Sequence, residues 1–277
     1  MSERRVTQVA SPYEPTTDPG VSRDTPAATL LFLVKSVPAG LWFFSSCVYG
    51  FFMSLLRFRD PSNGKRFGRV CAWGARRFLG LKVQVLNEER LYDNQPCVYV
   101  ANHQSDIDLF VYGQLYPTRT IITGKKEVLL VPFFGIMFYA MGNILIDRKR
   151  RDRAVASLQK AAQIIREKSV SIWVFPEGTR NPNRPMRPFK KGAFHLAVEA
   201  QVPIVPVAQS LQQYAVDPKR LRAPGGLIQV RILEPISTAG MTADDVDRLM
   251  EVTRTRMDEA LAEADAAAAA AAREQTA

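Results

Sequence analysis

The sequence predicts an α/β fold: a mixed, mostly parallel sheet covered by helices, with an N-terminal membrane-associated helical hairpin. Short runs rich in apolar and β-branched residues recur between residues 81 and 233, and helical stretches separate them. This alternation is typical of one sheet with helices packed on it. The hairpin is indicated by residues 36–56, which contain no charged residue, and by the basic amphipathic stretch that follows.

The first part of the chain divides into a lead and an apolar run. Residues 1–27 are rich in Pro, Ser, Thr and charge and show no apolar period, which predicts a disordered lead rather than a signal peptide. Residues 36–56 are long enough to cross a bilayer as a helix. Small and polar residues dilute the run, so a buried core helix is the alternative.

Residues 65–79 have the pattern of an amphipathic helix at the headgroup boundary. The apolar face consists of Phe67, Val70, Cys71, Gly74 and Phe78. The opposite face is basic, with Lys65, Arg66, Arg69, Arg76 and Arg77. We therefore interpret residues 28–80 as a membrane-associated hairpin. Both insertion into one leaflet and full spanning are compatible with the pattern.

The main domain is expected over residues 81–240. Its strands are predicted at 81–86, 97–101, 119–123, 143–146, 170–175, 203–208 and 227–233. Its helices are predicted from about Asp106, over 127–141 with a break at Pro132, over 151–168 and over 189–200. Residues 241–277 are expected to form a C-terminal helix (242–264) and an Ala-rich tail. The alanines at 266–272 favour a helix but have nothing specific to bury, so this tail is predicted to fray.

Composition narrows the classes of function. Apolar residues make up 47% of the chain, enough for a sizeable core. Cys47, Cys71 and Cys97 are scattered and odd in number, which indicates a reducing compartment and no disulfide framework. Two histidines and no Cys/His cluster predict no metal site. No dinucleotide or phosphate-loop motif is present, so no cofactor is expected.

Charge is concentrated in the middle of the chain. Within the net charge of +10, residues 118–231 hold 20 Lys and Arg against 7 Asp and Glu. Such a block indicates an anionic partner, either phosphate-bearing lipid or nucleic acid. The block lacks a clustered aromatic platform, a helix-turn-helix pattern and a zinc module, so nucleic acid is not expected as a partner.

Residues 102–108, Asn-His-Gln-Ser-Asp-Ile-Asp, form the first chemical motif. They follow a predicted strand and precede a helix, at the strand end where open α/β sheets place their sites. A carboxylate at Asp108 can contact one imidazole nitrogen of His103 and leave the other basic. On these residues alone, a helix cap with a loop histidine is an equal interpretation.

Three further motifs accompany the first. They are residues 142–148 (Gly-Asn-Ile-Leu-Ile-Asp-Arg), 175–180 (Phe-Pro-Glu-Gly-Thr-Arg) and 202–207 (Val-Pro-Ile-Val-Pro-Val). In this order and spacing the four blocks resemble the motifs of the glycerolipid acyltransferase family, most closely its 1-acylglycerol-3-phosphate acyltransferases. The resemblance covers roughly residues 81–210. It is specific because four motifs match together, whereas each alone is weak.

The resemblance implies direct attack on a thioester. His103, oriented by Asp108, would take the proton of the acceptor hydroxyl, and the acyl donor would be acyl-CoA or acyl carrier protein. An acyl-enzyme on Ser105 is the alternative mechanism. The resemblance also implies that Arg148 and Arg180 bind the glycerol 3-phosphate group and that Glu177 positions the acceptor. Gly178 and Thr179 belong to the same turn, and Lys126 is a further substrate-binding candidate near the phosphate.

These observations together predict an enzyme of phospholipid biosynthesis. The expected reaction converts lysophosphatidate to phosphatidate on the cell membrane, with the active domain facing the cytoplasm. Other acceptors, such as glycerol 3-phosphate or another lysolipid, are alternatives. A transacylase or thioesterase would use the same base. A non-catalytic module that binds anionic membranes is a different class, and it does not explain why His103, Asp108, Glu177 and Arg180 occur together.

Overall fold

A computed structural model describes residues 25–146 and 151–276. Its strands are β1 Leu81–Leu86, β2 Val98–Ala101, β3 Thr120–Lys125, β4 Ile144–Ile146, β5 Ser171–Val174, β6 Ile204–Gln209 and β7 Gly226–Ile232. Its α-helices are α1 Pro26–Leu56, α2 Asn63–Gly74, α3 Asp108–Tyr112, α4 Phe134–Ala140, α5 Arg151–Lys168, α6 Gly192–Ala200 and α7 Val246–Thr276. A π-helical turn, Ala75–Leu79, extends α2. Short 3₁₀ turns lie at Glu88–Leu91, Lys126–Leu130, Gln212–Tyr214, Pro218–Arg220 and Ala243–Asp245.

The described strands form one sheet in the order β1-β7-β6-β2-β5-β3-β4. Neighbouring strands pair in parallel except β6 and β7, which are antiparallel. The mixed, mostly parallel α/β fold expected from the sequence is therefore confirmed. Strand β2 lies between β6 and β5, so the residues that follow these three parallel strands meet at one edge of the sheet.

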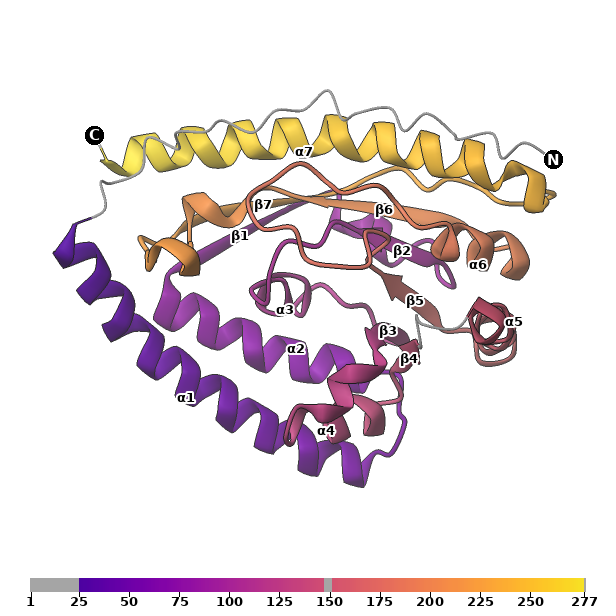
Figure 1. Ribbon diagram of the computed structural model, residues 1–277, viewed down its shortest axis with the longest axis horizontal. Coiled ribbons are helices and arrows are strands. Elements are labelled where there is room, and N and C mark those ends of the chain that lie inside the picture. The colour runs from indigo at the N-terminus through magenta and orange to yellow at the C-terminus, as the bar shows by residue number, and fades with distance from the viewer. Residues whose placement is uncertain (1–24, 147–150, 277) are drawn as a thin grey trace.

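Helices cover both faces of the sheet (Figure 1). One face packs against α3 and the π-helical turn, through residues such as Val111, Tyr112 and Leu79. The other packs against α5, α6 and α7, for example through Ile165 and Phe194. The strand residues in the middle of the sheet are buried on both sides, which is why β2 and β6 read as continuous apolar runs.

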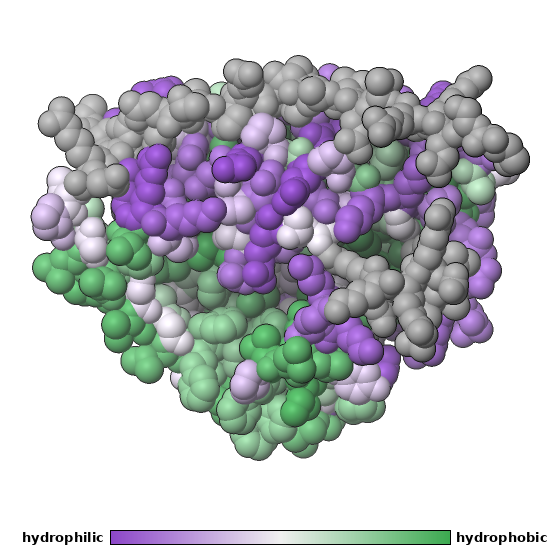
Figure 2. All heavy atoms as spheres, viewed as in Figure 1, coloured by the Kyte–Doolittle hydropathy of each residue, from purple (hydrophilic) through white to green (hydrophobic). Residues whose placement is uncertain are grey.

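Helix α1 extends beyond this core. Thr25 caps its first turn by accepting a hydrogen bond from the Ala28 amide at 3.2 Å, and Pro26 occupies the first helical position. Large apolar side chains on α1 are exposed, among them Leu41 and Phe52, which contradicts the alternative of a buried core helix. Among the described helices, α1 alone is long and apolar enough to cross a membrane. Figure 2 shows apolar side chains gathered along the lower edge, over α1 and α4.

The apolar face of α2 lies inside the protein, packed against neighbouring helices. Phe67 and Cys71 are buried in a cluster with Cys47 of α1 and Met137 of α4. Gly68 allows a close crossing with α3, because an added Cβ would lie 2.0 Å from the Gly113 carbonyl oxygen. A helical amphipathic pattern marks a buried face without identifying what buries it, and here neighbouring helices do so.

The C-terminal prediction of a fraying Ala-rich tail was wrong. Helix α7 continues through the alanines to Thr276, and Ala268, Ala269 and Ala272 are buried against Leu211 and Tyr214. Their small side chains let the helix lie close to the segment after β6. The tail therefore has a specific surface to bury, which is what holds a marginal helix in place. The lead predicted at residues 1–27 lies, up to residue 24, outside the described residues.

Candidate active site

The candidate site is built where β2, β5 and β6 end. His103 comes two residues after β2, Phe175 directly after β5, and Gln209 is the last residue of β6. Because these strands are parallel neighbours, their carboxyl ends lie at the same edge of the sheet. The structure thereby brings together side chains from three segments of the chain that are more than thirty residues apart.

His103 and Asp108 are in direct contact. The Nδ1 atom of His103 lies 2.6 Å from Oδ2 of Asp108, and the two side chains are 20% and 3% exposed. With the Nδ1 proton donated to the carboxylate, the other ring nitrogen, Nε2, is left as the basic one. The structure thus brings this predicted pair together in the geometry that a histidine general base requires.

The Asp108 carboxylate accepts four further hydrogen bonds. Its Oδ2 accepts from the Gln104 and Ser105 amides at 2.8 and 3.2 Å, because α3 begins at Asp108 and the loop folds back over it. Its Oδ1 accepts from the side-chain amides of Gln209 at 3.1 Å and Gln212 at 2.5 Å. A buried carboxylate needs such donors, and they fix the orientation of the carboxylate toward His103.

Sequence reasoning did not single out Gln209 and Gln212. Both follow the predicted strand 203–208, where polar residues ordinarily mark a loop. Asn102 strengthens the link between β2 and β6: its side chain donates to the Gln209 carbonyl and accepts from the Gln209 amide, at 2.9 and 2.8 Å. Only the sheet order, which places β6 beside β2, shows that these glutamines face Asp108.

The imidazole of His103 is held on its other sides by the segment after β5. Its ring stacks on Phe175, with centroids 4.2 Å apart and planes 19° apart. Glu177 accepts from the His103 backbone amide at 2.8 Å and from the Arg187 amide at 2.8 Å. Glu177 thus contacts the backbone of His103 rather than its ring, so it fixes the loop that presents the imidazole.

Burial raises the pKa of Glu177 to about 7, even though the Arg187 and His103 amides and the positive charge of Arg254 act in the opposite direction. Burial disfavours the charged form of a carboxyl group, and donated hydrogen bonds favour it. A strongly shifted buried carboxyl group beside a candidate base is typical of functional sites.

The 175–180 turn has the shape expected from its Pro and Gly. Gly178 has φ +70°, a left-handed conformation that glycine adopts without strain, and its amide donates to the Phe175 carbonyl at 3.1 Å. Thr179 and Arg180 follow and line the same cavity as His103. The Arg180 guanidinium forms an ion pair with Asp106 at 2.5 Å, and both side chains are exposed.

Two other predicted substrate-binding residues are less closely placed. Lys126 is exposed, and its neighbours Lys125 and Glu127 line the cavity near His103. Arg148, from the motif at 142–148, lies outside the described residues, as does Asp147. Asn143 of that motif accepts a hydrogen bond from the Ile122 amide at 3.0 Å and so aligns β3 with the start of β4.

A cavity of about 890 Å³ extends from this site toward α1 and α4. Its polar end contains His103, Asp108 and Arg180. Its apolar walls come from α1, α2, α4 and the sheet, and they include Phe32, Ala39, Phe43, Phe67, Ile122, Val131, Phe134, Met137 and Phe138. One space thus joins a candidate base to an apolar channel, an arrangement suited to a substrate with a polar head and a long hydrocarbon chain.

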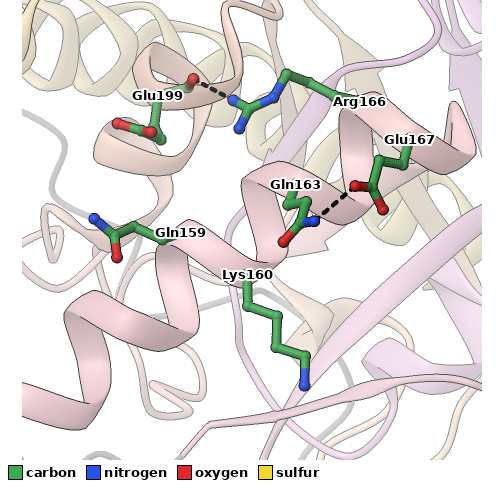
Figure 3. Close-up of a pocket in the computed structure, with 6 residues that line it drawn as sticks. All are labelled: Gln159, Lys160, Gln163, Arg166, Glu167 and Glu199. Atoms are coloured by element: carbon green, nitrogen blue, oxygen red, sulfur yellow. Dashed lines mark hydrogen bonds between the residues drawn. The ribbon is translucent and has the colours of Figure 1, made fainter.

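A second depression, between α5 and α6, has different chemistry (Figure 3). It is lined by polar side chains: Gln159, Lys160, Gln163, Arg166, Glu167 and Glu199. Arg166 donates to the Glu199 carbonyl at 2.7 Å, and Gln163 to Glu167 at 2.6 Å. These hydrogen bonds already occupy some of the lining groups, and the lining residues come from elements other than those of the candidate site.

The hydroxyl of Ser105 points away from the imidazole. It donates to the Gln212 side chain at 2.6 Å and accepts from the Ile107 amide at 3.0 Å. A serine nucleophile needs its proton directed to the base. Here that proton is directed to a glutamine, so the geometry favours direct attack over an acyl-Ser105 intermediate.

Comparisons with known proteins identify the family of the chain. The family described as Acyltransferase matches residues 82–210. A 1-acyl-sn-glycerol-3-phosphate acyltransferase of Haemophilus influenzae is 38% identical over 225 residues, or 79% of this chain and 90% of the relative. One from Escherichia coli is 34% identical over 236 residues, or 85% and 95%. The human enzyme of that name, form alpha, is 38% identical over 230 residues, or 79% and 81%.

A solved structure shares the fold. The 1-acyl-sn-glycerophosphate (LPA) acyltransferase PlsC from Thermotoga maritima matches with a TM-score of 0.65 and 22% identity, covering 86% of this chain and 97% of that one. The extent and the identity of the sequence matches go well beyond four shared motifs. The chain therefore belongs to the family of 1-acyl-sn-glycerol-3-phosphate acyltransferases.

Proposed function

We propose that the chain transfers a fatty acyl group from a thioester to the free hydroxyl of lysophosphatidate, forming phosphatidate for phospholipid biosynthesis. The observation that carries this proposal is the position of the His103–Asp108 pair at the polar end of an apolar cavity of about 890 Å³. Its family membership supports the same reaction. A lysophosphatidate molecule would place its acyl chain among the apolar walls and its glycerol hydroxyl near His103.

The chemistry follows from the basic nitrogen of His103. Nε2 takes the proton of the acceptor hydroxyl as its oxygen attacks the thioester carbonyl carbon. Asp108 stabilises the imidazolium that forms. The tetrahedral intermediate then expels the thiolate, which takes the proton from His103, so that the base returns to its starting state. The donor is acyl-CoA or acyl carrier protein, and no cofactor takes part in this scheme.

The remaining site residues either bind the acceptor or shape the site around it in this proposal. Arg180, together with Arg148, binds the 3-phosphate, with Lys126 nearby. Glu177 fixes the loop of His103, while Gly178 and Thr179 shape the turn beside it. A guanidinium presents paired donors that match phosphate oxygens. In the structure Arg180 pairs with the exposed Asp106, and a phosphate would replace that carboxylate as its partner.

The apolar helix α1 suggests that the protein associates with a membrane. We assign residues 28–80 to the membrane-associated part, 81–240 to the catalytic domain and 241–277 to a C-terminal part. We place the catalytic domain on the cytoplasmic side. Deleting residues 1–80 would also remove one wall of the cavity, since Phe32, Ala39 and Phe43 line it.

Arg180→Ala tests the acceptor assignment. It should lower kcat/KM for lysophosphatidate by roughly ten- to a hundredfold, since a charge-assisted hydrogen bond contributes about 1.5–3 kcal/mol. The KM for the thioester donor should change little. Arg180→Lys should recover part of the loss, because a point charge lacks the planar fork of the guanidinium. Steady-state kinetics with both substrates varied gives these values.

Two controls make this test specific. The exposed Arg184→Ala variant removes an equal charge four residues away and should leave acceptor kinetics near normal. An uncharged monoacylglycerol should be a poor acceptor that Arg180→Ala impairs little further. Equal losses with the charged and the uncharged acceptor would show that Arg180 does not bind the phosphate, and lysophosphatidate would lose that support as the substrate.

A further inference from the structure

Residues 129–139, between the end of β3 and the end of α4, expose an unusual set of apolar side chains. Leu130 is 81% exposed, Ile136 57% and Phe133 54%. The others are Leu129, Val131 and Tyr139. Water in contact with so large an apolar area is unfavourable, and contiguous patches of this kind mark interaction surfaces. Phe133 also has φ +60°, a strained conformation for a bulky residue.

This patch is continuous with the exposed apolar side of α1. The ring of Phe133 lies 6.3 Å from that of Phe44 on α1, edge to face, and both are exposed. The Arg59 amide, three residues after α1, donates to the Ala140 carbonyl at the end of α4 at 2.8 Å. Figure 2 shows the two regions as one green surface along the lower edge of the molecule. Any surface that covers the exposed apolar side of α1 therefore also covers residues 129–139.

The border of this patch has the chemistry of a membrane interface. The Arg59 guanidinium lies over the Tyr139 ring, 5.2 Å from its centroid, and donates to its hydroxyl at 3.4 Å. Arg57 is exposed at the end of α1, and Lys125 and Lys126 precede the patch. Tyr and basic residues at the edge of an apolar surface are typical of the headgroup level, where a positive charge meets lipid phosphate.

The geometry points to residues 129–139 as a second membrane-inserted element that lies beside α1 in a lipid bilayer. The same segment also lines the cavity, through Val131 and Phe134, beside Phe43 of α1, whose ring centroid lies 6.3 Å from that of Phe134. Two elements that this inference places in lipid therefore line the cavity together, which gives the acyl chain of a lysolipid a route into it from the bilayer. The insertion itself depends on membrane association and not on the proposed reaction.

Site-directed fluorescence tests the insertion. A bimane probe is attached to Leu130→Cys in the full chain, reconstituted into phosphatidylcholine and phosphatidylglycerol vesicles with lipids that carry a nitroxide in the acyl chain. Ser45→Cys on exposed α1 is the positive control, and the exposed Gln163→Cys on α5 is the matched negative control. The native cysteines are buried, so labelling of the unsubstituted protein measures the background.

We expect the probe at position 130 to shift to shorter wavelength and to be quenched severalfold, like the probe at 45, while the probe at 163 changes little. Quenching at 45 without quenching at 130 would overturn the inference and leave α1 as the membrane element. A probe at 130 that is shielded but not quenched, in a protein that cross-links as a dimer, would also overturn it, because a second copy would cover the patch.

An independent observation concerns Arg254 on α7. Its guanidinium donates to Asp258 at 2.7 Å and to the Arg187 and Met186 carbonyls at 2.6 and 2.7 Å. It also lies 5.0 Å from the centroid of Phe189. The Arg254 side chain is only 18% exposed. It therefore holds residues 186–189 through two backbone carbonyls and one aromatic ring.

Two hydrogen bonds, both accepted by Glu177, connect this backbone to the candidate base. The Arg187 amide donates to one oxygen of Glu177, and the His103 amide donates to the other. We infer that Arg254 is a positioning residue for the proposed reaction: it holds residues 186–189, so that Glu177 holds the loop that presents His103. Arg254 is not among the lining residues of the cavity, so it acts through these contacts and not on the substrate.

Arg254→Gln should therefore lower kcat by about tenfold with little change in either KM, because substrate binding is untouched. Arg254→Lys should restore part of the loss, and Arg256→Gln, which removes an exposed arginine from the same helix, should have no effect. Circular dichroism and thermal unfolding give the folded fraction. A loss of kcat no larger than the loss of folded protein would overturn the positioning role of Arg254. A rise in KM as large as the loss of kcat would overturn it as well. Wild-type turnover tests the proposed function separately.

Discussion

His103→Ala should abolish acyl transfer, lowering kcat/KM by at least about a thousandfold. General base catalysis contributes typically 10²–10⁴, and alanine removes the imidazole nitrogen that accepts the hydroxyl proton. The substrate KM values, where measurable, should stay near normal, since the cavity walls are unchanged. The measurement is the rate at which a labelled acyl chain is transferred from the thioester to lysophosphatidate, determined up to high enzyme concentrations.

The chain offers a matched control, because His195 is its other histidine. It lies on α6, it is not among the lining residues of the cavity, and its amide donates to the Lys191 carbonyl at the start of that helix. His195→Ala should retain transfer within a few-fold of wild type. If His103→Ala keeps more than a tenth of wild-type turnover while remaining folded and membrane-bound, His103 is not the base.

Asp108→Asn should be the second most severe change. The comparable substitution in a Ser-His-Asp triad costs about ten-thousandfold in kcat. Here the new amide would also place a donor against two amide side chains, Gln209 and Gln212, that already donate to this position. The imidazole would then lose both its orienting acceptor and the charge that stabilises the imidazolium. We expect a loss of roughly 10³–10⁴ in kcat and a lower unfolding temperature.

Asp106→Asn is the matched control for removing the negative charge of Asp108. Asp106 lies two residues earlier in the same motif and is exposed, and its partner is Arg180 rather than His103. It should retain most of the turnover and the unfolding temperature. Near-normal turnover of Asp108→Asn at full folded fraction would contradict the assignment of Asp108 as the residue that orients His103.

The strands were predictable because each one is a short apolar run bounded by turn residues. All seven lie within one or two residues of their expected positions. The surfaces that bury the Ala-rich end of α7 and the apolar face of α2 could not be predicted, for one reason. In both cases periodicity shows that a face is apolar or small, but the surface that buries it comes from distant parts of the chain.

The candidate site was predictable where a motif directly follows a predicted strand, as residues 102–108 and 175–180 do. His103 and Asp108 are five residues apart, and one turn of chain brings them together. Gln209 and Gln212 contact the same carboxylate across more than a hundred residues, and that contact depends on β6 lying beside β2. The Arg254 contacts with residues 186 and 187 depend on how α7 crosses the sheet. Long-range polar networks of this kind follow from the sheet order, which chain order alone does not specify.

The most direct test of the central claim is the product that the wild-type protein makes. Purified protein in vesicles is given a panel of lysolipids and monoacylglycerol, each with acyl-CoA and with acyl carrier protein as donor, and the lipids are identified by mass spectrometry. His103→Ala provides the blank. We expect phosphatidate from lysophosphatidate with at least one donor, far above every other product and absent from the blank. Equal acylation of phosphate-free acceptors, free fatty acid as the main product, or phosphatidate formed equally by His103→Ala would contradict the account.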